Sequence, residues 1–499
     1  MTTWLPDFTA QRAALTPDVT AFHDLVNGDK ASYRDLNRRA ARCASLLVSN
    51  GVSAGDRVCI LCRNRIEFFD ILFACAKLGA VLVPLNWRMP AAELLPLIAD
   101  AEPALLFFGD EDAEVARELS VSTTAMIALD DTDGYVTQRD TSELYPGRAL
   151  WPAEETWYLL YTSGTTGKPK AVIQTYAMAV ANYVNIGQAM SICANDVTLN
   201  YLPLFHTAGI NLVTLPTLIE GGEVLLLHDF DLDRVMTLLA DAALDTFFAV
   251  PAVYQQISLD PRFDSLDLSQ VRSWGCGGAP MSDELLKRFI SRGARVCNGM
   301  GMTETGPTVF IMDPEHVTQK IGSVGKPQML SSVRIVDRNG NDVAQGESGE
   351  LWFAGPGTTP GYWDNEDATA QAFNDDGWLM SGDIGRCDED GYYYVVGRIK
   401  DMYISGGENV YPAEVENILA GHPDILEAAV VATPDEQWGE VGCAFLLVKP
   451  GHTLPDESAL TSYCRERLAP YKVPKKFRVA TDFPRTAAGK VQKHLLQVD

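Results

Sequence analysis

The sequence predicts an α/β protein with a large N-terminal domain of doubly wound sheets, a small antiparallel β subdomain and a small α+β C-terminal domain. The 499 residues are too many for a single hydrophobic core, so two or more domains are expected. Up to Leu330, segments with helical spacing alternate with short apolar runs, which is typical of parallel β-α-β units. From Ser331 onward, Asn-Gly, Pro-Gly and Asp-Gly turns separate short strands, which favours an antiparallel sheet.

The alternation of helix and strand signals begins in the first 150 residues. The most membrane-like stretch, residues 68–85, contains Asp70, Lys77 and Pro84. It falls short of the roughly 20 uninterrupted apolar residues that cross a bilayer, so we expect a buried helix and no membrane span. The predicted helices are residues 33–50, 68–78 and 91–101, and the predicted strands are residues 58–62, 80–84 and 104–108.

The same alternation continues beyond residue 150 and places loops where ligands usually bind. In doubly wound sheets, that place is beyond the carboxyl ends of the strands. We place the domain boundary at Lys400, before an α+β segment of residues 401–499. The predicted helices are residues 177–190, 232–243 and 282–292, the predicted strands are 198–202, 246–250, 333–336, 349–353 and 391–396, and a glycine-rich loop spans 275–280.

Charge excludes several classes of partner. Lys and Arg total 40 against 66 Asp and Glu, a formal charge of −26, which argues against nucleic acid and against an anionic membrane surface. An anionic small molecule would need a local concentration of positive charge, and one exists near the C-terminal end. It comprises Arg465, Arg467, Lys472, Lys475, Lys476, Arg478, Arg485, Lys490 and Lys493.

The ten cysteines indicate a reduced environment. They are scattered from Cys43 to Cys464, and a chain this long needs no disulfides, so a cytoplasmic location is expected. Cys59 and Cys62 have the spacing of a metal or redox pair, but no second pair or histidine lies close to them in sequence. Because they fall in a strand-like run, where positions three apart face opposite sides, we interpret both as core residues.

A ten-residue stretch, Tyr161-Thr-Ser-Gly-Thr-Thr-Gly-Lys-Pro-Lys170, lies between two apolar runs and is predicted to be a loop between strands. Glycine lets backbone N–H groups turn inward, and hydroxyls and lysines add donors, so the loop suits a polyphosphate. A flexible linker rarely lies between two strands. A Walker loop needs four residues between its first glycine and Gly-Lys, whereas two residues separate Gly164 from Gly167.

This stretch resembles the phosphate-binding signature of the adenylate-forming superfamily, which includes acyl-CoA synthetases, luciferases and peptide-synthetase adenylation domains. The resemblance covers essentially the whole chain and is to the acyl-CoA synthetase branch, with its fatty acid–CoA and 4-coumarate or feruloyl–CoA ligases. It implies an AMP- and acyl-binding domain (1–397), a hinge (398–400) and a mobile C-terminal domain (401–499). It assigns the ATP phosphates to Thr162, Ser163, Gly164, Thr165, Thr166, Gly167, Lys168 and Lys170.

A second motif, Asn298-Gly-Met-Gly-Met-Thr-Glu304, resembles the family segment beside the nucleotide. The resemblance implies that Thr303 supplies a hydroxyl to the α-phosphate and that Glu304 supplies a carboxylate to Mg²⁺. The family generally has an aromatic residue, stacked on adenine, where this chain has Met300. Further nucleotide contacts are implied for Gly278, Ala279, Pro280, Asn298 and Gly299.

The ribose site and the hinge are implied by later motifs. Ser381-Gly-Asp383 resembles the segment whose aspartate accepts hydrogen bonds from both ribose hydroxyls, although an ordinary Asx turn is the alternative. Residues 398–416 resemble the hinge and the loop after it, which implies that Arg398 contacts ribose and phosphate and that Lys400 occupies the hinge position. The approach of CoA is assigned to Ser405, Gly406, Gly407 and Glu408.

The segment Pro484-Arg-Thr-Ala-Ala-Gly-Lys490 resembles the motif that ends in the family's mobile catalytic lysine. Attack of a carboxylate on the α-phosphate brings two anions together. A cation that bridges them stabilises the transition state more than the ground state.

His206, in Phe205-His-Thr-Ala-Gly209, is assigned by the resemblance to the gate of the acyl pocket. A general-base role is disfavoured because a carboxylate needs no base to attack ATP and a thiol is already fairly acidic, with a pKa of roughly 8.5. Peptide-synthetase domains usually hold an aspartate in this region, so its absence argues against an α-amino acid substrate. The other implied pocket residues are Gly209, Asn211, Val250, Cys276, Gly277, Gly301 and Met302.

Together the motifs imply an AMP-forming carboxylic acid–CoA ligase that uses ATP, CoA and Mg²⁺ and acts through an acyl-adenylate. The segments expected to line the pocket carry almost no cationic side chain, which disfavours a dicarboxylate such as malonate. They are residues 206–213, 247–250, 274–279 and 300–310. Fatty acids and aryl or cinnamate-type acids both stay open, since apolar pockets discriminate methylenes by only about 1–3 kcal/mol each.

Two alternatives to the ligase also stay open. One is an adenylation enzyme that loads a carrier protein, and the other is a non-catalytic nucleotide-binding paralogue. Intact Thr303, Glu304, Asp383, Arg398 and Lys490 argue against the paralogue. We expect small-molecule partners and no nucleic acid, and leave open a homodimer.

Overall fold

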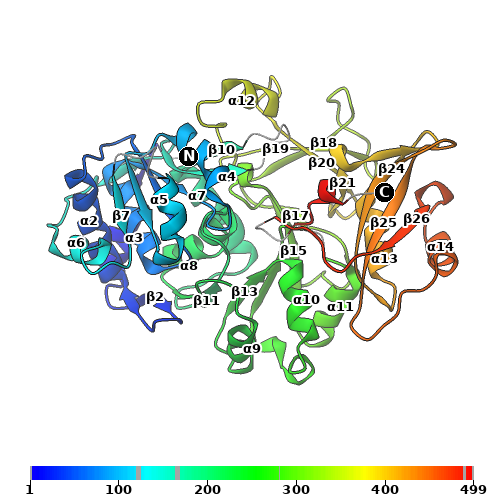
Figure 1. Ribbon diagram of the computed structural model, residues 1–499, viewed down its shortest axis with the longest axis horizontal. Coiled ribbons are helices and arrows are strands. Elements are labelled where there is room, and N and C mark those ends of the chain that lie inside the picture. The colour runs from blue at the N-terminus through cyan, green and yellow to red at the C-terminus, as the bar shows by residue number, and fades with distance from the viewer. Residues whose placement is uncertain (1–2, 120–124, 163–168, 280, 487–489, 497–499) are drawn as a thin grey trace.

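The computed structural model describes residues 3–119, 125–162, 169–279, 281–486 and 490–496. Two large sheets form the N-terminal part, and a five-stranded sheet near the C-terminus lies at the opposite end of the molecule from the first sheet (Figure 1). A four-stranded antiparallel sheet lies between them in the sequence. The architecture is the predicted combination of doubly wound sheets, a small β subdomain and an α+β C-terminal domain.

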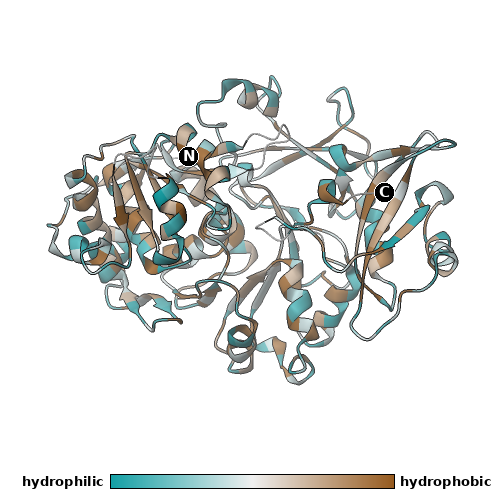
Figure 2. Cartoon of the chain, viewed as in Figure 1, coloured by the Kyte–Doolittle hydropathy of each residue, from teal (hydrophilic) through white to brown (hydrophobic). Residues whose placement is uncertain are grey.

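The first sheet has the order β10-β9-β5-β4-β6-β7 and is parallel except for the pair β10-β9. Hydrophobic residues, brown in Figure 2, are concentrated in it. The strands are β4 (Arg57–Leu61), β5 (Val81–Pro84), β6 (Leu105–Phe108), β7 (Met126–Ala128), β9 (Thr156–Thr162) and β10 (Lys170–Thr175). The helices are α1 (Phe8–Leu15), α2 (Tyr33–Ser49), α3 (Ile66–Leu78), α4 (Ala91–Ala101), α5 (Ala113–Leu119) and α6 (Tyr135–Thr141), and β1 (Trp4–Pro6) pairs with β8 (Leu150–Pro152).

Helix α3 confirms the prediction of a buried helix. Every residue in it except Glu67 is buried, and Gly79 closes its C-terminus with a φ of 89°. No helix among the described residues is long and apolar enough to span a bilayer. Cys59 and Cys62 are buried free thiols, as predicted for core residues.

The second sheet has the order β17-β16-β15-β14-β13-β11-β12-β2-β3 and is parallel from β15 to β2. Its strands are β2 (Thr20–Asp24), β3 (Lys30–Ser32), β11 (Val197–Asn200), β12 (Glu223–Leu226), β13 (Thr246–Ala249), β14 (Ser273–Cys276), β15 (Val296–Met300), β16 (Phe310–Ile311) and β17 (Lys326–Pro327). Its helices are α7 (Tyr176–Ala189), α8 (Thr214–Glu220), α9 (Leu232–Ala240), α10 (Pro251–Leu259) and α11 (Asp283–Ser291), and residues 208–212 form a π-helical turn.

The prediction of a helix over residues 232–243 is too long. Helix α9 ends at Ala240, because Ala242 adopts a φ of 51°. The amide of Ala243 then donates to the carbonyl of Leu238, 3.0 Å away, a bond typical of a helix terminus.

The β subdomain comprises β18 (Ser332–Val336), β19 (Ser348–Ala354), β20 (Leu379–Cys387) and β21 (Tyr393–Arg398), with α12 (Glu366–Ala372) between β19 and β20. The sequence did not predict β20. The C-terminal sheet has the order β23-β22-β25-β24, and β26 pairs with β25. Its elements are β22 (Tyr403–Ser405), β23 (Glu408–Val410), α13 (Pro412–Ala420), β24 (Ile425–Asp435), β25 (Gly439–Val448), α14 (Glu457–Arg465) and β26 (Lys476–Val479).

The C-terminal domain contacts the large domain at α11. Lys449 Nζ lies 3.1 Å from Glu284 Oε1, and the amide of Asp283 donates to Asn417 Oδ1 at 3.5 Å. The last part of the chain, red in Figure 1, runs back from β26 toward the centre of the molecule. This course brings the predicted catalytic lysine to the large domain.

Candidate active site

The predicted phosphate loop connects two antiparallel strands, as expected. Thr162 at the end of β9 faces Lys170 at the start of β10, and Thr162 Oγ1 donates to the carbonyl of Lys170 at 3.4 Å. The residues between them that were assigned to phosphate, Ser163 to Lys168, lie outside the described residues.

The turn Thr303–Thr305 is fixed from two sides. Gln174 Nε2, on β10, donates to the carbonyl of Thr303 at 2.9 Å, and the amide of Thr359 donates to the carbonyl of Glu304 at 2.8 Å. The chain reaches this turn through Gly301, where an added Cβ would lie 1.5 Å from the Pro307 carbonyl oxygen. Thr303 and Glu304 are each 8% exposed. The backbone of the predicted α-phosphate and metal residues is therefore tied to the strand that follows the phosphate loop.

Asp383 and Arg398 face each other across two strands of the β subdomain. They are register partners in β20 and β21, and Arg398 Nε donates to Asp383 Oδ1 at 2.8 Å. Burial raises the pKa of Asp383, and Arg398 and Lys490 oppose that rise. Because Asp383 lies inside β20 and its carboxylate pairs with Arg398, it is not the capping residue of an Asx turn.

Lys490 lies in the same electrostatic environment, although it comes from the C-terminal domain. Burial lowers its pKa and Arg398 lowers it further, whereas Asp383 and Glu304 oppose the shift. The Lys490 carbonyl accepts a 2.7 Å hydrogen bond from the amide of Thr486, which ties the backbone of the lysine to Thr486. Glu304 and Lys490 are 186 residues apart in sequence, yet their charges interact in the structure.

His206 also lies near Lys490. Burial lowers the pKa of His206 to about 4, and Lys490 contributes to the shift. The imidazole is therefore neutral at pH 7. In this state it is not a cation that would pair with a second carboxylate.

Three parallel strand ends bring part of the predicted nucleotide and acyl sites together. An added Cβ at Gly278 would lie 3.4 Å from Val250 Cγ1, and one at Gly277 would lie 3.4 Å from the Gly299 carbonyl oxygen. Cys276 is paired with Asn298 across β14 and β15. The described members of this group are Val250, Cys276, Gly277, Gly278, Ala279, Asn298, Gly299, Met300, Gly301 and Met302, and Pro280 lies outside the described residues.

Asn211 differs from the other predicted pocket residues because its carboxamide has partners inside the protein. Tyr158 Oη donates to Asn211 Oδ1 at 2.6 Å, and Asn211 Nδ2 donates to Gln174 Oε1 at 3.4 Å. Asn211 lies in the π-helical turn that also contains Gly209. Its side chain links the pocket wall to Gln174, and its role toward an acyl group stays a prediction.

The predicted hinge and CoA residues lie beyond β21. Lys400 is exposed in the 3₁₀ turn Ile399–Asp401. Ser405 is 1% exposed at the end of β22, and Gly406 and Gly407 form the turn to β23 with φ values of 62° and 88°. The positive φ values alone account for glycine at both positions. The assignment of these glycines to CoA therefore rests on the resemblance and not on their geometry.

Glu304 fits the way that Mg²⁺ binds proteins. No cluster of three or more His, Cys, Asp or Glu side chains in the described part of the chain could form a protein-only metal site. Mg²⁺ usually takes one or two carboxylates and completes its coordination with phosphate oxygens and water. A single carboxylate in a turn tied to β10, the strand that follows the predicted phosphate loop, matches that requirement.

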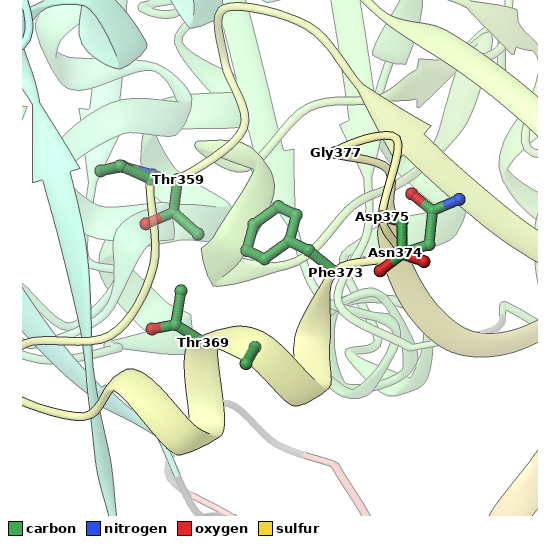
Figure 3. A pocket seen from close by; sticks show the side chains of 8 residues that line it. Thr359, Thr369, Phe373, Asn374, Asp375 and Gly377 are labelled. Atoms are coloured by element: carbon green, nitrogen blue, oxygen red, sulfur yellow. The ribbon is translucent and has the colours of Figure 1, made fainter.

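An open hollow of about 480 Å³ lies beside α12, close to this site. Its lining side chains include Thr359, Thr369 and Phe373 (Figure 3). Thr359 Oγ1 donates to the Ile173 carbonyl at 2.7 Å, and Thr369 Oγ1 donates to the Asn365 carbonyl at 2.9 Å. These hydroxyls have partners within the protein, and none of the predicted site residues lines the hollow.

Two residues of this arrangement were not predicted, Gln174 and Tyr362. Tyr362 Oη donates to Glu304 Oε1 at 2.9 Å, and Gln174 binds the neighbouring carbonyl of Thr303. Neither lies in one of the quoted motifs. Their proximity to the turn arises only from folding.

Comparisons with known proteins match this geometry over the full chain. The AMP-binding enzyme family model matches residues 9–363, and the model of the AMP-binding enzyme C-terminal domain matches residues 414–490. Feruloyl-CoA synthase from Amycolatopsis is 39% identical over 98% of this chain and 97% of that protein. The long-chain-fatty-acid–CoA ligase FadD13 of Mycobacterium tuberculosis is 33% identical over 98% of this chain and 96% of its own length.

A solved structure shows the same fold with an intermediate bound. It is o-succinylbenzoate CoA synthetase (MenE) from Bacillus subtilis in complex with the acyl-adenylate OSB-AMP. It superposes with a TM-score of 0.90 at 32% identity and covers 100% of this chain and 99% of that one.

Proposed function

Because the chain belongs to the adenylate-forming superfamily, as an acid–thiol ligase of its acyl-CoA synthetase branch, we propose that it joins an apolar carboxylic acid to CoA through an acyl-adenylate. The observation that carries the mechanism is the electrostatic interaction of Lys490 with Glu304, Asp383 and Arg398, which lowers or raises the pKa of its ammonium group. That interaction supports an adenylation-competent arrangement of the two domains.

In the first half-reaction, the carboxylate of the acid attacks the α-phosphorus of ATP. An acyl–oxygen–phosphorus bond forms, and pyrophosphate leaves. Both reacting groups are anions, so the ammonium group of Lys490 lowers the barrier by stabilising the charge of the transition state. The ionised carboxylate of Asp383, which accepts hydrogen bonds and donates none, would orient the ribose by binding the ribose hydroxyls. Bound Mg²⁺, held by Glu304, would neutralise phosphate charge.

In the second half-reaction, the CoA thiolate attacks the acyl carbonyl and AMP leaves. We propose that the C-terminal domain first turns about Lys400 and withdraws Lys490. A hinge of a few residues can absorb such a rotation. The exposure of Lys400 in a short 3₁₀ turn, with no buried side chain in that turn, supports this position for the hinge.

We propose an aryl or cinnamate-type acid as the first substrate class and a fatty acid as the second. The 39% identity to a feruloyl-CoA synthase supports the first, and the 33% identity to a long-chain fatty acid ligase supports the second. A neutral His206 offers no cationic partner for a second carboxylate, which disfavours malonate.

The test is pyrophosphate release with ATP and Mg²⁺ across a panel of acids, with and without CoA. The panel contains ferulate, other cinnamates, benzoates, malonate, and short, medium and long fatty acids. We expect one apolar class to respond and thioester to form with CoA. Pyrophosphate release without a CoA thioester would instead indicate carrier loading, and ATP binding without pyrophosphate release would indicate a non-catalytic protein.

A further inference from the structure

The segment 359–363 lies between the phosphate-loop strand and the turn that carries Glu304. On one side, the amide of Ile173 donates to the Gly361 carbonyl at 3.1 Å, and the amide of Trp363 donates to the Ala171 carbonyl at 2.8 Å. These bonds extend the edge of β10. On the other side, the amide of Thr359 binds the carbonyl of Glu304. The segment therefore connects the two parts of the predicted phosphate and metal site.

Tyr362 makes this connection through its side chain. Its Oη lies 2.9 Å from Glu304 Oε1, and its ring centroid lies 5.0 Å from Lys170 Nζ. An ionised carboxylate only accepts hydrogen bonds, so the phenol is the donor. A cation at this distance from an aromatic face is attracted to it. One side chain thus contacts both the carboxylate of the turn and the last lysine of the phosphate loop.

We propose that Tyr362 is a positioning residue: its phenol holds Glu304 Oε1 and so orients the carboxylate that would bind the cation that accompanies ATP. The proposal rests on the proposed function, because Glu304 is the metal ligand in it. Carboxylates that bind metals are commonly held by a second hydrogen bond, which fixes their orientation.

The backbone contacts of the segment do not need the phenol. The Tyr362 amide donates to Thr369 Oγ1 at 2.9 Å, and the neighbouring amides bind β10 and Glu304 as described. Thr369 lies in α12 beside the open hollow (Figure 3). Removal of the hydroxyl alone should therefore leave the segment in place and release only the carboxylate.

The experiment compares Tyr362→Phe with wild type by titrating ATP in the absence of acid and CoA, so that no turnover occurs. Calorimetry gives the ATP affinity in EDTA and at increasing Mg²⁺ concentration. We expect the affinity in EDTA to change by less than about twofold. The gain in affinity that Mg²⁺ provides should fall about tenfold to a hundredfold, as expected for losing a hydrogen-bond partner of a metal ligand.

Tyr392→Phe is the matched control. Tyr392 Oη donates to Asp313 Oδ2 at 2.7 Å, so the same change removes a similar phenol–carboxylate bond outside the predicted site residues. The control should keep the Mg²⁺ dependence of wild type. Glu304→Gln, made both in wild type and in Tyr362→Phe, completes a double-mutant cycle. If Tyr362 acts through Glu304, adding Tyr362→Phe to Glu304→Gln should produce no further loss.

Two results would overturn the proposal: unchanged Mg²⁺ dependence in Tyr362→Phe, or equal loss of affinity with and without Mg²⁺. Additive effects of the two substitutions would also contradict it. If wild type itself does not bind ATP, the proposed function fails instead, which is a different outcome. Should Tyr362→Phe fail to fold, Tyr362→Leu, which keeps an apolar side chain and has no donor, is measured in its place against the same criteria.

Discussion

Two carboxylates, Asp70 and Asp383, are both buried and both face cations, but the cations come from different parts of the chain. Asp70 is 0% exposed, and its Oδ2 accepts hydrogen bonds from Arg39 Nε at 2.9 Å and Arg139 Nη1 at 3.0 Å. Asp383 is 5% exposed and pairs with Arg398. Burial raises the pKa of each carboxyl group, and cations oppose the rise in both.

The difference lies in the second cation. At Asp70, both guanidinium groups are hydrogen-bonded to the same carboxylate oxygen, and the three residues belong to helices α2, α3 and α6 of one domain. At Asp383, the second cation is Lys490, which comes from the other domain and forms no ion pair with another described residue. The cations of the first cluster both bind the carboxylate within one domain, whereas the second leaves a lysine for an anionic ligand.

From this comparison we infer that a buried charge is structural when its partners belong to one folded unit and functional when they meet across a domain boundary. A lowered lysine pKa supports this interpretation, because strongly perturbed groups gather at functional sites. The substitutions below separate the two clusters, since one should change stability and the other activity.

The largest effect is expected from Lys490→Ala. Adenylation, measured as pyrophosphate release, should fall on the order of a thousandfold, because the cation that stabilises the transition state is removed. Thioester formation from supplied acyl-adenylate should stay near wild type, since the proposed rotation of the C-terminal domain withdraws Lys490 before that step. Lys320→Ala, which breaks a 2.8 Å ion pair with Asp388, serves as the control. Equal loss of both half-reactions would contradict the assignment.

Asp70→Asn should change stability and leave the chemistry intact. Removing the charge leaves Arg39 and Arg139 without their shared anion, and breaking a buried pair costs about 3 kcal/mol or more. We expect a clear fall in the melting temperature and unchanged kcat per folded molecule. An unaltered melting temperature would show that the cluster is not structural.

Asp383→Asn should show the opposite pattern. AMP affinity should fall about thirtyfold, or about 2 kcal/mol, because the ribose loses an ionised acceptor. The melting temperature should change less than in Asp70→Asn, since Arg398 is 40% exposed and can be solvated. Nucleotide titration and thermal denaturation of the same samples test both statements. A larger loss of stability than of affinity would reverse the comparison.

The sequence predicted the regular elements better than the contacts of the site. Helix α4 has its predicted bounds, Ala91–Ala101, because an apolar face and a flanking proline mark it locally. Strand β20 was not predicted, because Ser381, Gly382 and Asp383 interrupt its apolar pattern. Those polar residues are part of the candidate site, so the features that serve the site also hide the strand.

The motifs name candidate site residues where these are consecutive in sequence, as in the turn of Thr303 and Glu304. The structure adds their contacts, such as the pairing of Arg398 with Asp383, and their roles toward the nucleotide stay predictions. Tyr362 could not be predicted in this way. Its contact with Glu304 depends on the pairing of residues 361–363 with β10, which no local pattern specifies.

The smallest effect is expected at a third charged pair, His228 and Asp24. The exposure of its side chains is intermediate between those of the two clusters. His228 Nε2 is 3.0 Å from Asp24 Oδ2, and the exposed fractions of the side chains are 32% and 2%. The hydrogen bond with Asp24 raises the pKa of His228. A raised folded-state pKa contributes stability below the unfolded value of about 6.5, and this stability is lost as the pH rises through the folded pKa.

His228→Gln should therefore destabilise the protein at pH 5.5 by less than about 1 kcal/mol, and by less still at pH 8.5. Melting curves at the two pH values, with exposed His494→Gln as the control, measure the difference. A pH-independent loss would mean that packing, and not charge, holds this pair, and would place it outside the comparison of buried charges.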